Sequence, residues 1–191
     1  MMKKSLLLLA ALVLGGCATH WPESALLNPQ IIPSNQQYYS GNRITMEGVD
    51  KREAAYVFSI KKKEKAPVLV NSSQPLNNLL AEKLAEGLRS QGLEVGNSGT
   101  TNLTLAISTA AVMVEEKTFT YVTKSKVSLQ VIADFQGNKL TKQFNMSSSK
   151  EEPGEPTMAD LESTLNQQLG SVLQQIMADE ALRGYLKGQP S

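Results

Sequence analysis

The sequence predicts an α+β domain, with an antiparallel sheet that contains a three-stranded meander and two amphipathic helices packed on one face. Residues 101–148 place apolar side chains at alternate positions in successive stretches, which is typical of strands with one covered face. Residues 76–88 and 161–177 instead repeat leucines at helical spacing. Two helices are too few to cover both faces of a large parallel sheet, so both are expected on one face of an antiparallel sheet.

The first strands are expected between residues 42 and 70. Residues 42–50 alternate weakly between apolar and polar side chains and predict one strand, while residues 55–60 either extend it or form another. Residues 68–70 predict a further short strand. Between them lies the charge run KKKEK at residues 61–65, which we interpret as a solvated hairpin or loop.

The first helix is expected to begin after Ser72 and Ser73, which are candidate N-caps. Pro75 follows early in the helix, where its missing N–H group costs no hydrogen bond. Gly92 is the expected C-terminal stop, and residues 93–95 are expected to form a short strand.

The meander is predicted to have strands at residues 101–114, 119–135 and 140–146. In the middle strand, one face is apolar and consists of Val127, Leu129, Val131, Ala133 and Phe135. Ser128, Gln130 and Asp134 occupy the other face. Residues 136–138 (QGN) predict a hairpin turn, because glycine and asparagine tolerate positive φ.

The C-terminal part predicts a second long helix. Residues 147–156 are expected to form a polar loop, and the helix begins near Thr157 with Asp160 at the capping-box position. A short helix at residues 179–186 is expected to close the fold.

The N-terminus has the order of a bacterial export signal. Lys3 and Lys4 form a basic start, and residues 6–14 form an apolar run that is too short to span a bilayer, which needs about 20 residues. Residues 1–16 are therefore predicted to be a signal peptide.

The signal ends in a lipobox, formed by Leu14, Gly15, Gly16 and Cys17. Its aliphatic and small residues suit recognition by the signal peptidase, and the thiol of Cys17 is predicted to receive a diacylglyceryl group. The new amino terminus is predicted to receive a further acyl chain, such as palmitate. Two or more chains give stable membrane anchoring.

Residues 17–40 are predicted to be the lipidated cysteine and a flexible tether, because prolines alternate there with polar residues. A few of its aromatic and aliphatic side chains are expected to dock on the domain or to rest at the lipid interface. Residues 41–188 are predicted to form one periplasmic domain. Ala18 follows the lipobox in place of the aspartate of an inner-membrane retention signal, so the outer membrane is the expected destination.

Composition argues against several classes of function. Removal of Lys3 and Lys4 leaves 17 basic against 18 acidic residues, so the mature net charge of about −1 does not favour nucleic-acid binding. Cys17 is the only cysteine and His20 the only histidine, which disfavours a catalytic triad or a histidine-rich metal site. The charged cluster of residues 50–53 (DKRE) is the nearest approach to an acid–base pair, and we interpret it as solvated. We therefore expect no enzyme activity, cofactor or metal.

The sequence resembles the YajG family of proteobacterial lipoproteins from about residue 42 to residue 187. The resemblance lies in residues 76–95, 102–107, 137–142 and 165–178. It implies an outer-membrane-type lipoprotein of uncharacterised function, and it supplies no catalytic residues.

Two functions remain open. The first is a non-catalytic accessory domain that binds a protein of the cell envelope, with the uncovered sheet face as the binding surface. The second is a carrier or chaperone for a lipid or another apolar ligand, held between helix and sheet. The lysines of the charge run, Lys61, Lys62, Lys63 and Lys65, are a candidate contact for an acidic partner or for anionic lipid headgroups.

Overall fold

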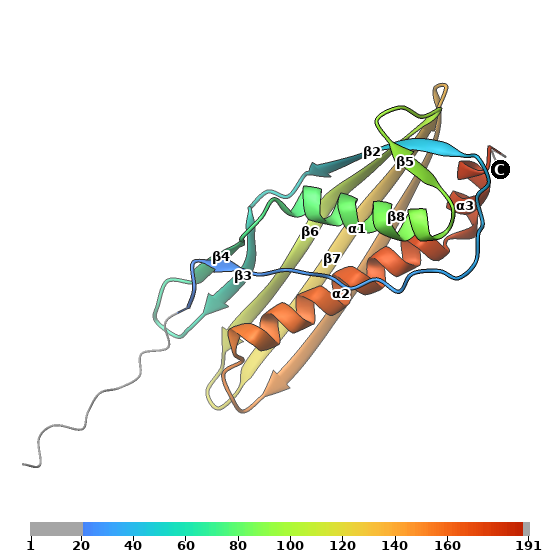
Figure 1. Cartoon of the computed structure of the whole chain (residues 1–191). Coiled ribbons are helices and arrows are strands. Elements are labelled where there is room, and N and C mark those ends of the chain that lie inside the picture. The colour runs from blue at the N-terminus through green and yellow to red at the C-terminus, as the bar shows by residue number, and fades with distance from the viewer. Residues whose placement is uncertain (1–20, 189–191) are drawn as a thin grey trace, which may run out of the picture.

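The computed structural model describes residues 21–188, which form a curled mixed sheet with helices on one of its faces (Figure 1). The predicted signal peptide, the lipobox with Cys17, and His20 lie outside these residues. The strands are β1 (Ser24–Ala25), β2 (Arg43–Asp50), β3 (Tyr56–Lys61), β4 (Val68–Ser72), β5 (Glu94–Gly96), β6 (Thr101–Glu116), β7 (Tyr121–Phe135) and β8 (Asn138–Glu152). The helices are α1 (Leu76–Ser90), α2 (Met158–Ala178) and α3 (Glu180–Leu186).

The predicted meander is confirmed: β6 pairs antiparallel with β7, and β7 pairs antiparallel with β8. Outside the meander β3 and β4 also pair antiparallel, but the prediction of an antiparallel sheet is wrong for the remaining strand pairs. The other edge of β6 is shared by β2 and β3, and both pair with it in parallel, as do β5 with β2 and β1 with β4. Each parallel pair joins strands that are separated in the sequence by further elements, because a short hairpin can join only antiparallel strands. β5 and β6, which follow α1, run parallel to β2 and therefore antiparallel to β4.

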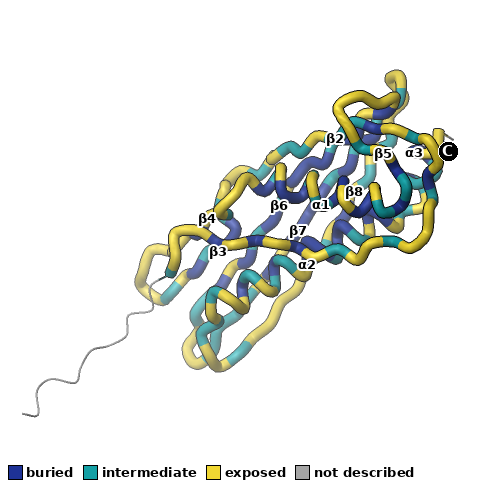
Figure 2. The backbone as a smooth tube through the Cα atoms, viewed as in Figure 1, coloured by how far each residue is buried: buried dark blue, intermediate teal, exposed yellow. Residues whose placement is uncertain are grey.

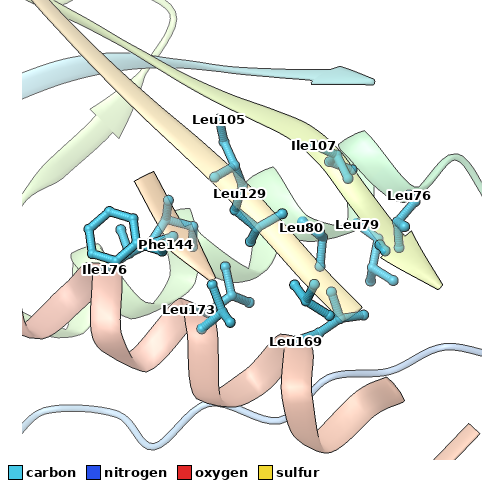
Figure 3. Packing of buried hydrophobic residues seen from close by; sticks show 14 of the residues in the cluster. Leu76, Leu79, Leu80, Leu105, Ile107, Leu129, Phe144, Leu169, Leu173 and Ile176 are labelled. Carbon is cyan, nitrogen blue, oxygen red and sulfur yellow. The ribbon is translucent and has the colours of Figure 1, made fainter. Parts of the chain in front are cut away.

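Both long helices pack on the same face of the sheet, and the core lies between them and the strands (Figure 2). Leu80 of α1, Leu129 of β7 and Leu173 of α2 are fully buried and point into the same space (Figure 3). Burying each such side chain contributes about 1.5–3 kcal/mol. The alternation in β7 is confirmed, since Val127, Leu129, Val131 and Ala133 are all fully buried.

The predicted serine cap of the first helix is wrong. Ser72 belongs to β4, where it pairs with Ala25 of β1, and the N-cap of α1 is Pro75, which has no capping side chain. β4 extends to Ser72 because it pairs there with Ala25, which lies 47 positions earlier in the chain. The residues next to Ser72 give no indication of this distant partner.

The predicted capping box of α2 is confirmed. The hydroxyl of Thr157 accepts a hydrogen bond from the amide of Asp160, and the carboxylate of Asp160 accepts one from the amide of Thr157. We expect Thr157→Ala to lower the free energy of unfolding by about 1 kcal/mol, because it leaves a helix-end amide without its partner. Urea denaturation measures this change, and Thr164→Ala, in the interior of the same helix, is the control with the smaller expected loss.

The third strand of the meander is longer than predicted. Residues 147–152, expected as part of a polar loop, continue β8 to Glu152, opposite Tyr121. Both faces are polar here: Ser148, Lys150 and Glu152 line a groove beside α2, and their neighbours lie on the opposite, open face. The backbone ladder itself requires no apolar side chains.

The described part of the predicted tether packs against the domain, which corrects the boundary expected at residue 40. Ala25 and Leu27 are buried, and the backbone amide of Asn28 donates to the side chain of Asn166 in α2. Further along, the amides of Tyr38 and Tyr39 donate to the carbonyl of Gln91. The segment thus runs across the helix layer and leaves the opposite sheet face uncovered (Figure 1).

Candidate functional site

The sheet face opposite the helices is the candidate site, and we call it the open face. Successive side chains of a strand point to opposite faces. The odd-numbered residues of β7 from Ser125 to Ala133 are buried toward the helices, so the even-numbered residues between them belong to the open face. Across the strands the open-face positions of β7 are opposite polar residues of β8: Lys124 pairs with Ser149, Lys126 with Ser147, Ser128 with Asn145 and Gln130 with Gln143.

Side-chain hydrogen bonds order the centre of the open face. The hydroxyl of Ser128 donates to the amide oxygen of Asn145 at 2.6 Å, and the amide nitrogen of Gln143 donates to the same hydroxyl at 2.8 Å. These bonds join neighbouring strands and hold the amides in place, so the face offers a partner fixed donors and acceptors.

Two lysines lie beside this cluster. Lys124 and Lys126 are exposed, two positions apart on β7, and no carboxylate of the described residues lies within 4.0 Å of either ammonium group. Their nearest cross-strand neighbours, Ser149 and Ser147, are small. The two charges are therefore accessible to an acidic surface.

Exposed apolar side chains border the two lysines. Met113 of β6 pairs with Lys124 on one side and with Ser59 of β3 on the other, and Ser59 pairs with Leu69 of β4. The exposed fractions of Met113 and Leu69 are 48% and 53%, which is high for large apolar side chains. The open face thus combines cations, fixed amides and accessible apolar area.

The charged cluster at residues 50–53 lines a separate groove. It lies where β6 passes from its pairing with β2 to its pairing with β3, and Ser108–Ala111 of β6 line a groove of about 410 Å³ there. The Arg52 guanidinium donates to both carboxylate oxygens of Asp50, at 2.9 Å from Nε and 2.7 Å from an Nη, and to the carbonyl of Tyr56. These hydrogen bonds lower the pKa of Asp50. The pair joins β2 to β3, and we assign it a structural role.

We expect Asp50→Asn to lower the free energy of unfolding at pH 7 by about 1–2 kcal/mol. The estimate lies between the values for buried and exposed pairs, because the side chain of Arg52 is only 8% exposed but that of Asp50 is 32% exposed. Since the pKa of Asp50 is lowered in the fold, its contribution is present above the usual carboxyl pKa of about 3.9 and is lost as the pH falls through the folded value.

Urea unfolding of wild type and Asp50→Asn at pH 7 and pH 3 measures this dependence. The difference between the two proteins is expected to shrink at the lower pH. Glu94→Gln is the control, because its 2.5 Å pair with Arg43 has both side chains more than half exposed and is expected to contribute less than about 1 kcal/mol. An Asp50→Asn effect no larger than that of Glu94→Gln contradicts the structural role.

The predicted charge run lies in the hairpin between β3 and β4, as expected. Lys62 pairs with Glu155 at 2.7 Å, and their hydrogen bond raises the pKa of Lys62. Lys61, Lys63 and Lys65 form no salt bridge with another described residue. Within residues 21–188 no group of three His, Cys, Asp or Glu side chains is placed to hold a metal ion.

Sequence reasoning placed Ser128 and Gln130 on the open face but missed Lys124 and Lys126. It predicted the partner strand only over residues 140–146 and missed its continuation to Glu152. The signal was present: the alternation that buries Val127 extends back to Lys124 without interruption. The partner residues of β8 had no such signal, because alternation cannot be recognised where both faces are polar.

Comparisons with known proteins identify the family and the fold. The model of a family described as uncharacterized lipoprotein matches residues 29–187. No curated protein matches the sequence. The structure of protein XCC0632 from Xanthomonas campestris is similar with a TM-score of 0.65 and 9% identity, over 88% of this chain and 99% of that one. At this identity the likeness shows the fold alone.

Two further structures match with TM-scores too low to support a conclusion about fold or function. The first is the hypothetical protein CT253 from Chlamydia trachomatis, with a TM-score of 0.38 and 10% identity over 78% of this chain and 99% of that one. The second is the rare lipoprotein B from Shewanella oneidensis, with a TM-score of 0.36 and 11% identity over 71% of this chain and 93% of that one.

Among the residues that the structure describes, no helix has the length and apolar character needed to cross a membrane. Since the family model covers most of the sequence, this protein belongs to that family of lipoproteins.

Proposed function

We propose that this protein is a YajG-type lipoprotein, held by acyl chains on Cys17 at the periplasmic face of the outer membrane, with a non-catalytic domain that binds an acidic envelope protein through its open face. The observation that carries the proposal is the pair of exposed lysines, Lys124 and Lys126, on a face whose neighbouring amides are fixed by hydrogen bonds. Tethering raises the effective concentration of such a surface for partners in the same membrane.

The filled interior supports binding at the surface over carriage of an apolar ligand. The side chains between α1, β7 and α2 contact one another as a continuous core (Figure 3). A carrier needs an apolar space of a few hundred Å³ at this position. Recovery of stoichiometric lipid from an anchor-free domain would favour the carrier function instead.

Site-specific photocrosslinking in cells tests the open face. A photoreactive amino acid at Gln130, beside the lysines, is expected to capture an envelope protein, whereas the same group at Glu82, on the exposed side of α1, is expected not to capture it. Charge reversal by Lys124→Glu together with Lys126→Glu is expected to abolish the crosslink and leave the circular dichroism spectrum unchanged, because both side chains are exposed.

The matched control is Lys83→Glu, which reverses one charge on α1 and is expected to leave the crosslink intact. An identical set of products from both positions, or a crosslink that survives the double reversal, contradicts the proposal.

A further inference from the structure

Strand register shows which end of the domain lies next to the membrane anchor. β1 pairs in parallel with β4, with Ser24 opposite Asn71 and Ala25 opposite Ser72. The chain before Ser24 therefore points back toward the start of β4, where the β3–β4 hairpin with residues 61–65 lies. From Cys17 to Trp21, the first described residue, an extended chain spans at most about 14 Å.

A second hairpin lies at the same end. β3 and β6 run parallel, with Lys61 opposite Glu115, so the turn after β6 is next to the β3–β4 hairpin. The two hairpins are joined directly: the backbone amide of Lys63 donates to the carboxylate of Glu116 at 3.0 Å, and the Lys63 ammonium reaches the Thr118 hydroxyl at 3.5 Å. We call these two hairpins, residues 61–67 and 115–121, the anchor-side tips.

The anchor-side tips combine an exposed aromatic ring with lysines. Phe119 is 86% exposed, in a tight turn closed by a hydrogen bond from the amide of Lys117 to the carbonyl of Thr120. A rigid turn thus holds a large apolar side chain in solvent. Aromatic residues flanked by lysines are typical of protein segments that lie at a membrane–water interface.

Charges at the tips favour a headgroup layer only moderately. Residues 61–65 contain four lysines and one glutamate, but neighbouring carboxylates offset part of this charge, since Glu155 pairs with Lys62 and Glu115 with Lys117. The tips also include the carboxylates of Glu64 and Glu116. Insertion of Phe119 must therefore supply much of the contact, with the lysines adding attraction to anionic lipids.

We infer that the anchor-side tips rest on the phospholipid surface that holds the lipid anchor, with Phe119 inserted at the interface and Lys63 and Lys65 at the phosphate groups. The contact is intramolecular once the anchor is in the bilayer, so even a weak interaction orients the domain. The long strands β6, β7 and β8 then extend away from the membrane and the open face is accessible from the side. This inference rests on the lipidation of Cys17 in the proposed function.

The absence of any cysteine other than Cys17 allows a direct test on the full lipidated protein. Ala66→Cys, in the β3–β4 hairpin, and Asn138→Cys, at the start of β8 and at the opposite end of the sheet, each add one free thiol for an environment-sensitive fluorophore. The proteins are reconstituted in vesicles of phosphatidylethanolamine and phosphatidylglycerol that contain lipids with a nitroxide on the headgroup. We expect a blue shift and strong quenching at position 66, and neither at position 138.

Substitutions at the tips separate the contribution of Phe119 insertion from that of lysine attraction to anionic lipids. Phe119→Ser is expected to lower the ratio of docked to undocked domains about tenfold, which corresponds to loss of one buried apolar side chain. Ile32→Ser is the matched control, because Ile32 is 77% exposed but lies in the segment across the helix layer. Lys63→Gln with Lys65→Gln is expected to weaken quenching in the anionic vesicles, more at low than at high salt, and to have no effect in vesicles of phosphatidylcholine alone.

The outcomes distinguish failure of docking from failure of anchoring. Co-flotation of the protein with vesicles, together with equal quenching at positions 66 and 138, overturns the docking alone. Oxidation of the unlabelled Ala66→Cys protein to a disulfide-linked dimer on the vesicles, together with no lipid quenching of the labelled protein, assigns the tips to a self-interface and also overturns it. A protein that does not float with the vesicles contradicts lipid anchoring, and the inference falls with it.

Discussion

Replacing Cys17 with alanine is expected to abolish acylation of the protein and, once the signal peptide is removed, to release the domain into the soluble periplasmic fraction. One myristoyl chain alone binds a bilayer with a constant of only about 10⁴ M⁻¹, so stable attachment depends on the several chains predicted at Cys17. Metabolic labelling with an alkyne analogue of palmitate measures the acylation, and fractionation of the cell envelope measures the attachment.

A second variant keeps the test decisive. In Cys17→Ala an uncleaved apolar run can itself hold the chain in the inner membrane, so a second protein begins at Ala18 behind the signal peptide of a soluble periplasmic protein. If that second protein remains fully membrane-bound, lipid anchoring at Cys17 is wrong. Ala18→Asp, which retains Cys17, tests the sorting prediction: it is expected to retain acylation and move the protein from the outer to the inner membrane.

Gly48→Val is expected to lower the free energy of unfolding by about 3 kcal/mol, the upper part of the range for overpacked cores. Gly48 lies on the helix-facing side of β2, and a Cβ placed there meets the carbonyl oxygen of Asn77 in α1 at 2.2 Å. The obstacle is helix backbone, which cannot rotate away as a side chain can. The substitution also strains the hydrogen bond from the Asn77 amide group to the Gly48 carbonyl, which is 3.0 Å long.

Gly96→Val is the matched control for this substitution. Gly96 is also in a strand, β5, but a Cβ added there has no neighbour within 4 Å. Urea or thermal unfolding is expected to separate the two variants clearly. Equal stability of Gly48→Val and Gly96→Val contradicts the close approach of β2 and α1.

The elements that the sequence predicted well are those with one apolar face. The leucine stripe of α1 and the alternation of β7 bury the residues expected from them, except that Phe135 is only partly buried. A regular element that packs on a core repeats its apolar side chains with its own period. The capping box of Thr157 and Asp160 was also predictable, since its hydrogen bonds join residues three positions apart.

Pairing partners were less predictable. On one edge of β6, β2 pairs with Thr101–Ile107 and β3 pairs with Val112–Glu115. These pairings are made by backbone hydrogen bonds, and because backbone groups are alike in every residue, the sequence does not show which strands will pair. The polar end of β8 was missed, and the docking of residues 24–40 was predicted only for a few side chains. Both are fixed by hydrogen bonds to distant parts of the chain, such as that of Asn28 with Asn166.

The sequence by itself predicted a lipoprotein, because the proposed lipobox is a contiguous motif, and the family match agrees with that prediction. It also determined the helices and the meander. Only the tertiary structure decided which residues meet: that Lys124 and Lys126 lie beside a fixed polar cluster, and that Phe119 lies at the same end of the sheet as the hairpin of residues 61–65. These placements follow from long-range register, and no local pattern of side chains encodes the register of strands whose outer faces are polar.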